Sequence, residues 1–142
     1  MKRKLSFVIS VFIVGILLVL LVPYIFKAFK KDNVVHIQYA EMNEMIEKGE
    51  EFFLIISKEE CPDCNELKDK LEKTNDKGHV LYIYEYAIDR PETIISELQD
   101  VFPNFIFVPY VCYVNNGVVE EYNGEMDVNK IFEWMDNLQD NK

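Results

Sequence analysis

Two cysteines three residues apart are the residues of this chain best suited to chemistry. Cys61 and Cys64 enclose Pro62 and Asp63, after an apolar run at residues 52–57 and before a polar, helix-like segment at residues 65–71. We therefore expect a buried strand to deliver both thiols to the first turn of a helix. There, residues i and i+3 share one face with Cβ atoms about 5–6 Å apart. A small adjustment brings the Cβ atoms to the separation of about 3.5–4.5 Å that a disulfide needs, so a disulfide between the two cysteines should form and open easily.

The start of a helix should also make one thiol reactive. Free N–H groups and the positive end of the helix favour a thiolate, and Pro62 suits a first turn that needs no N–H there. Three neighbouring carboxylates, of Glu59, Glu60 and Asp63, disfavour the thiolate. At a separation of about 4 Å from the sulfur, the repulsion by each carboxylate costs about 1 kcal/mol in water and about 4 kcal/mol at an intermediate dielectric constant. A helix N-terminus or a Cys-X-X-Cys motif lowers the pKa of a cysteine by about 1–5 pH units, and each pH unit corresponds to about 1.36 kcal/mol in favour of the thiolate. We expect the pKa of Cys61 to lie below the value of about 8.5 for free cysteine but above that of the most strongly oxidising Cys-X-X-Cys proteins.

Thiol–disulfide exchange gives the two cysteines different roles. A thiolate attacks a disulfide sulfur to form a mixed disulfide, which a second thiol resolves. Cys61, at the helix tip, fits the exposed nucleophile, and Cys64, one turn in and on the apolar stripe, fits the resolving thiol. The alternative of an inert bridge is weaker, because so short a loop adds little stability.

A zinc site is the second alternative for the cysteine pair. Zinc takes four ligands, usually from a second closely spaced pair. Only Cys112, His36 and His79 remain, and they are scattered along the chain, so we expect no metal and no cofactor. Cys112 lies among Val and Tyr on an apolar segment, which is typical of a buried cysteine, although it would be a third redox thiol if it faced the pair. The two histidines are interpreted as ordinary residues at strand ends.

Apolar patterns indicate the elements that must position the pair. Helical spacing marks four helices, shorter apolar runs mark the strands, and Asn116-Gly117 is a strong hairpin signal. The order β-α-β-α-β-α-β-β-α predicts an α/β fold with a central mixed sheet, parallel first and antiparallel later, and helices on both faces. The expected strands are 34–37, 52–57, 80–84, 110–114 and one from 118, and the expected helices are 39–46, 65–71, 91–101 and 128–138.

The N-terminal region differs from the rest of the chain. Residues 5–26 form an uncharged, mostly apolar run of 22 residues, and a helix of that length spans about 33 Å, enough to cross a bilayer core. A cleaved signal peptide is the alternative, but the run is longer than a typical signal and lacks a small-residue cleavage site. We expect one transmembrane helix within an anchor and linker at residues 1–31, and a domain at residues 32–142 outside the cytoplasm.

Charge is divided between these two parts. Six of the fifteen basic residues lie at or before Lys31, and all twenty-five acidic residues follow it, which leaves a balance of −16 from Asp32 onward. So acidic a domain is not expected to bind nucleic acid or an anionic membrane surface. We interpret the excess chiefly as a source of solubility.

Three motifs, in this order and spacing, resemble the thioredoxin superfamily over about residues 34–139. They are Cys61-Pro62-Asp63-Cys64 after the second strand, Val108-Pro109 about 45 residues later, and the turn at residues 115–117. Within the superfamily, an anchored acidic domain with a Cys-Pro-Asp-Cys motif resembles the bacteriocin transport accessory proteins.

The resemblance implies further roles around Pro109. It implies a cis peptide bond before Pro109 and a Val108 backbone that pairs with the substrate segment. Apart from the resemblance, the aromatic residues around Pro109 are expected to be mostly core, with one or two lining an exposed apolar lip for a peptide. They are Phe102, Phe105, Phe107 and Tyr110, and we expect Tyr110 to contact the substrate together with Val108 and Pro109.

The chain also departs from the thioredoxin pattern. Glu60 stands where thioredoxins have a Trp, Ile55 stands where they have a buried Asp, and Pro-Asp replaces Gly-Pro between the cysteines. The reducing power of a thioredoxin therefore does not follow from the resemblance. The predicted function is a membrane-anchored, extracytoplasmic thiol–disulfide oxidoreductase acting on cysteines of exported peptides or proteins, such as a bacteriocin. The alternative is a non-catalytic binding module for an export partner. Neither the direction of electron flow nor the redox partner follows from the sequence.

Overall fold

The structure is a computed structural model that describes residues 33–74, 78–87 and 91–140. The predicted membrane helix, at residues 5–26, lies outside these ranges. Within them, every helix is too short or too polar to cross a bilayer.

The predicted order of elements is confirmed, with shifts of a few residues at their ends. The helix after the cysteine motif has Pro62 in its first turn, as predicted, but continues to Thr74, beyond the segment expected at residues 65–71, and the strand predicted at residues 80–84 is longer. The strands are β1 (Val34–Ile37), β2 (Phe52–Lys58), β3 (Leu81–Tyr86), β4 (Tyr110–Asn115) and β5 (Val118–Glu121). The helices are α2 (Tyr39–Glu47), α3 (Pro62–Thr74), α4 (Pro91–Val101) and α5 (Val128–Asp140).

The five strands form one mixed sheet in the order β1-β3-β2-β4-β5. β3 pairs in parallel with both β1 and β2, whereas β4 pairs antiparallel with β2 and β5, as predicted. Because Ile56 near the end of β2 lies opposite Tyr110 at the start of β4, the chain leaving β2 and the chain entering β4 meet at one edge of the sheet. This pairing brings the cysteine motif and Pro109 to the same place.

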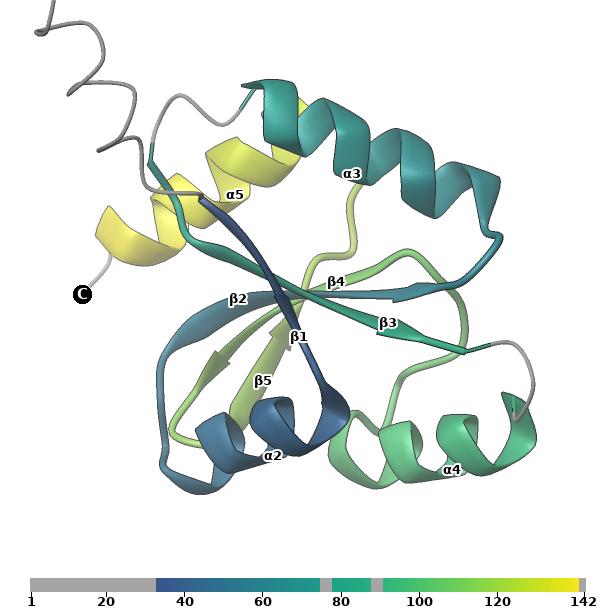
Figure 1. The fold of residues 1–142 in the computed structure, drawn as a ribbon. Coiled ribbons are helices and arrows are strands. Elements are labelled where there is room, and N and C mark those ends of the chain that lie inside the picture. Colours follow the sequence, from purple (N-terminus) through teal and green to yellow (C-terminus); the bar gives the residue numbers. More distant parts are fainter. Residues whose placement is uncertain (1–32, 75–77, 88–90, 141–142) are drawn as a thin grey trace, which may run out of the picture. The chain divides into compact units, whose positions relative to one another are not determined.

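Helices cover both faces of the sheet (Figure 1), α3 and α5 on one face and α2 and α4 on the other. β2 is the central strand of this sandwich, and its residues Phe52 to Ile56 are at most 4% exposed. Phe53 and Ile55 face α3 and α5, while Leu54 and its alternate neighbours face α2 and α4. The uninterrupted apolar run is thus explained by burial on both faces.

Two turns follow from residues that accept a positive φ. Asn116 and Gly117 have φ angles of 49° and 75°, and Asn115 lies opposite Val118, so the predicted hairpin has the two-residue loop that Asn-Gly favours. Gly49, with φ of 68°, ends α2 and leads the chain into β2.

Candidate active site

The turn between β2 and α3 places Cys61 directly before the first residue of the helix. The Cys61 N–H donates to the Lys58 carbonyl at 3.3 Å, and Glu60 between them has a φ of 58°. The Asn65 N–H then donates to the Cys61 carbonyl at 3.1 Å, which is the first hydrogen bond of α3. Cys61 is therefore the N-cap residue, and Pro62 occupies the next position, where no N–H is needed.

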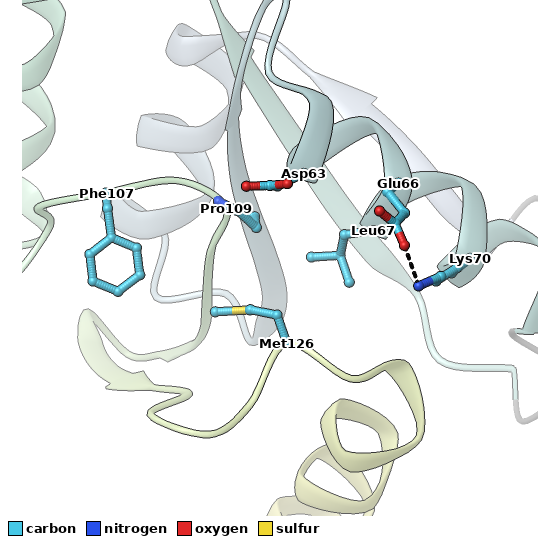
Figure 2. A pocket seen from close by; sticks show the side chains of 7 residues that line it. All are labelled: Asp63, Glu66, Leu67, Lys70, Phe107, Pro109 and Met126. Carbon is cyan, nitrogen blue, oxygen red and sulfur yellow. Dashed lines mark hydrogen bonds and ion pairs between the residues drawn. The ribbon is translucent and has the colours of Figure 1, made fainter.

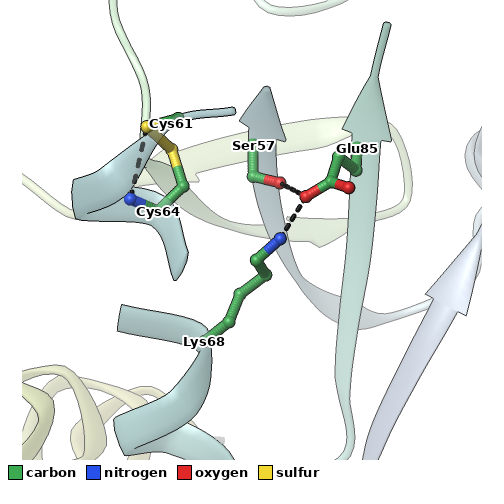
Figure 3. The surroundings of a disulfide bond; sticks show 5 residues. All are labelled: Ser57, Cys61, Cys64, Lys68 and Glu85. Atoms are coloured by element: carbon green, nitrogen blue, oxygen red, sulfur yellow. Dashed lines mark hydrogen bonds and ion pairs between the residues drawn. A yellow bond between two sulfur atoms is a disulfide. The ribbon is translucent and has the colours of Figure 1, made fainter. Parts of the chain in front are cut away.

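The structure joins Cys61 and Cys64 in a disulfide, with their Cα atoms 5.3 Å apart (Figure 3). The Cys64 N–H also donates to Cys61 Sγ at 3.2 Å. This is the bond that an N-cap serine or aspartate accepts from the third residue of a helix, with sulfur in place of oxygen. In the reduced protein the same N–H is available to a Cys61 thiolate.

Exposure separates the two sulfur-bearing residues. Cys61 is half-buried, whereas Cys64 is 1% exposed and lies on the inner side of α3 with Leu67 and Leu71. A partner in solution can therefore approach Cys61 and not Cys64. This arrangement is the one expected of a nucleophile and its resolving thiol.

A polar network lies close to the disulfide (Figure 3). Lys68 of α3 donates to Glu85 Oε2 of β3, and the buried Ser57 hydroxyl of β2 donates to the same oxygen at 3.0 Å. The hydrogen bond from Lys68 lowers the pKa of Glu85 most, burial opposes it, and Ser57 lowers it further. Lys68 follows Cys64 by four residues, so the two lie on the same side of α3.

Sequence reasoning missed this network because its members come from three elements. A faint signal exists in the sequence: Ser57 follows five apolar residues on β2, and Glu85 follows four mostly apolar residues on β3. The two are partners in the parallel register, which only the sheet pairing reveals.

Pro109 lies in the loop that leads into β4. The Val108–Pro109 peptide bond is cis, as the resemblance implied. Val108 is half-buried and Pro109 is buried. Tyr110 is 6% exposed and packs in the core on the α2 and α4 side, and burial is the main cause that raises the pKa of its hydroxyl.

The four aromatic residues near Pro109 separate into two groups. Phe102, Phe105 and Tyr110 are buried, whereas Phe107 is 66% exposed. Most of the group is core, as expected, and Phe107 is the member that remains available for an exposed lip.

A groove of about 330 Å³ lies between α3 and the loop before β4 (Figure 2). Its α3 side carries Asp63, from between the two cysteines, and the ion pair of Lys70 with Glu66 at 2.5 Å. Leu67 of α3 also lines the groove, and the other sides are apolar, formed by Phe107, Pro109 and Met126.

The remaining cysteine lies apart from the pair. Cys112 is fully buried among apolar side chains on the α2 and α4 side of the sheet, and α3 covers the other side. Burial raises the pKa of its thiol, and the nearby Glu121 raises it further. These facts favour the interpretation of Cys112 as a core residue.

The two histidines lie at strand ends, as predicted. His36 is exposed near the end of β1, and the buried His79, just before β3, lies 2.8 Å from Asp136 of α5. In the ranges that the structure describes, no three His, Cys, Asp or Glu side chains are grouped so that they could hold a metal ion.

Two of the three departures from the thioredoxin pattern, Ile55 and Glu60, lie in different surroundings. Ile55 is fully buried in the apolar core under α3 and α5. Glu60 is exposed in the turn before Cys61. Glu85 of β3 adds a further carboxylate to the surroundings of the disulfide (Figure 3), from a different strand than Ile55.

The chain is similar in structure to several solved proteins. It superimposes on thioredoxin f from spinach chloroplast with a TM-score of 0.56 and 15% identity, covering 76% of this chain and 95% of that one. For thioredoxin O2 from Arabidopsis thaliana in the oxidized state, the TM-score is 0.53, the identity 21%, and the coverage 76% and 96%. For the J-Trx1 fragment of ERdj5, the TM-score is 0.56 with 16% identity.

These likenesses show that the described domain has a thioredoxin fold. The match to the ERdj5 fragment covers 75% of this chain but only 52% of that one. No protein-family model and no curated protein sequence matches the chain.

Proposed function

We propose that this protein is a thiol–disulfide oxidoreductase that works through Cys61 and Cys64. One observation carries the proposal: Cys61 caps α3, is partly exposed, and accepts the Cys64 N–H, while Cys64 is bonded to it from the buried side of the same turn. An inert bridge would need neither the exposure of one sulfur nor the adjacent groove. The thioredoxin fold of the domain agrees with this chemistry.

The reaction proceeds in two balanced steps. In the reduced protein, the Cys61 thiolate attacks one sulfur of a substrate disulfide; a bond forms between the two sulfurs, the substrate S–S bond breaks, and the second substrate sulfur leaves as a thiolate. Cys64 then loses its proton and attacks Cys61 Sγ, which releases the first substrate sulfur and closes the Cys61–Cys64 disulfide. Two electrons pass to the substrate, whose thiolates take up two protons, and the reverse sequence oxidises a dithiol.

The loop before β4 would hold the substrate during these steps. The proposal assigns the Val108 backbone to pairing with an extended segment that flanks the reacting cysteine. Pro109 and the exposed Phe107 form one wall of the groove in which that segment lies.

The finer proposal concerns where the domain works. On sequence grounds, residues 5–26 anchor the chain in a membrane and the acidic domain lies outside the cytoplasm. The substrates would then be cysteines of exported peptides or proteins, and a bacteriocin is the narrowest form of this hypothesis.

A mixed-disulfide trap tests the proposed chemistry. The reduced full chain with Cys64→Ser is incubated with a peptide disulfide, and adducts are identified by mass spectrometry. We expect the variant to accumulate one adduct on Cys61, the wild type to resolve it, and Cys61→Ser to form none. If the peptide is held without a covalent bond, and Cys61→Ser binds it as well as the wild type does, the domain is a binding module and the proposal is wrong.

A further inference from the structure

Two large apolar side chains next to the candidate active site face solvent. Ile106 is 79% exposed and Phe107 is 66% exposed, in the loop that leads to Pro109. The neighbouring aromatic residues, Phe105 and Tyr110, are buried, so Ile106 and Phe107 are the large apolar side chains of this loop that are exposed. Exposed apolar patches beside a reactive group are typical of a surface that another chain covers.

Phe107 lies where two grooves adjoin. The groove along α3 and a second one of about 210 Å³ share Phe107, Pro109 and Met126 as lining residues. The second groove continues past Ile106 to Glu121 of β5. Together they form a track beside the cysteine motif, with apolar side chains at its centre.

Negative charge lines both ends of this track. Asp63 and Glu66 line the α3 groove, and Glu121 lines the second groove. Lys70 is the one basic residue among the lining residues of the two grooves, and it is engaged with Glu66 at 2.5 Å. The exposed Glu60 adds negative charge in the turn before Cys61.

We propose that the occupant of this track is an extended, cationic segment of another polypeptide that carries the reacting cysteine. An apolar side chain of that segment would pack against Phe107 and Met126, and Lys or Arg side chains on either side would face Asp63 and Glu121. The charge complementarity of the two groove ends selects a cationic partner over a neutral or an acidic one. This inference rests on the proposed function, since it names the substrate class of the same site.

The test compares two synthetic peptides that differ only in charge. Each contains one cysteine as a mixed disulfide with 2-mercaptoethanol and one neighbouring Leu, and the flanking residues are two Lys in one peptide and two Glu in the other. The second-order rate constant for reaction with the reduced full chain is measured by stopped flow, and 2-hydroxyethyl disulfide serves as the small neutral reference.

We expect the Lys peptide to react about tenfold faster than the Glu peptide at low ionic strength, because exchanging Lys for Glu replaces attraction to the exposed Asp63 and the half-buried Glu121 with repulsion. The ratio should shrink toward one at about 1 M salt, where the screening length is about 3 Å. Asp63→Asn and Glu121→Gln should each reduce the ratio, and Phe107→Ala should slow both peptides relative to 2-hydroxyethyl disulfide.

Glu47→Gln is the matched control. Glu47 is exposed at the end of α2, before the chain enters β2, and so lies at the edge of the sheet opposite the cysteine motif. This variant should keep the full ratio. Equal rates for the two peptides, or the same loss of ratio in Glu47→Gln as in Asp63→Asn, would overturn the inference and leave the proposed function intact. If neither peptide nor the small disulfide reacts with Cys61 in the folded protein, the proposed function fails and the inference fails with it.

Discussion

The hydrogen-bonded pair of Lys68 and Glu85 should make the stability of the domain depend on pH. The Lys68 ammonium holds the pKa of Glu85 below its usual value, and the Ser57 hydroxyl adds to this effect. Because the folded-state pKa is lowered, the pair stabilises the domain above the unfolded glutamate pKa of about 4.3. That contribution is lost as the pH falls through the lower folded-state value.

Burial sets the size of the effect. The side chains of Lys68 and Glu85 are 13% and 32% exposed. The pair thus lies between exposed pairs, which contribute about 0.2–1 kcal/mol, and buried ones, whose disruption costs about 3–5 kcal/mol. After allowance for solvent screening at Glu85, we expect Glu85→Gln to lower the free energy of unfolding by about 1–2 kcal/mol at neutral pH.

Urea unfolding of the disulfide form at about pH 7 and about pH 3 tests this prediction. The deficit of Glu85→Gln against the wild type should be present at neutral pH and smaller in acid, with an unchanged dependence on urea concentration. Glu72→Gln, an exposed site on α3, is the control and should show little deficit at either pH. A deficit of Glu85→Gln that is absent at neutral pH, or equally large in acid, would refute the reasoning.

Three further substitutions test other parts of the account. Cys112→Ser should leave the mixed-disulfide trap unchanged, and Cys112 should resist iodoacetamide in the folded protein because its thiol is buried with a raised pKa; rapid labelling would contradict this. Ile55→Asp should lower the free energy of unfolding by about 3 kcal/mol or more, since it buries a carboxylate in an apolar core, and urea unfolding would show it. Glu60→Gly should raise the free energy of unfolding by about 1 kcal/mol, because glycine adopts the positive φ without a Cβ clash; a loss of stability would argue against a strained turn.

The fold was largely predictable because its signals are local. Short apolar runs predicted the strands, and apolar residues at helical spacing predicted the helices, so the order of elements followed. The Asn116-Gly117 dipeptide predicted the hairpin, whose backbone has the positive φ angles that this dipeptide favours. The position of Cys61 at the start of α3 was also predictable, because a strand, a proline and a helix-like segment follow one another along the chain. The ends of α3 and β3 moved by a few residues because tertiary pairing, and not propensity, decides them.

Other features of the site depend on which distant segments meet. Ser57 and Glu85 are neighbours only because β2 and β3 pair in that register, and Lys68 reaches them only because α3 packs over the same face. Likewise, nothing in the sequence distinguishes Phe107 from Phe105, although Phe107 is exposed and Phe105 is buried. Their separation follows from the path of the loop into β4, which the sequence pattern does not specify.

The central claim is that the N-terminus of α3 holds Cys61 as a reactive thiolate. The most direct measurement is the rate of Cys61 alkylation by iodoacetamide as a function of pH, in the reduced protein with Cys64 and Cys112 replaced by serine. The helix terminus and the backbone N–H of residue 64 predict a pKa below the value of about 8.5 for free cysteine. A pKa at or above about 8.5, or a Cys61 that does not react in the folded domain, would contradict the account.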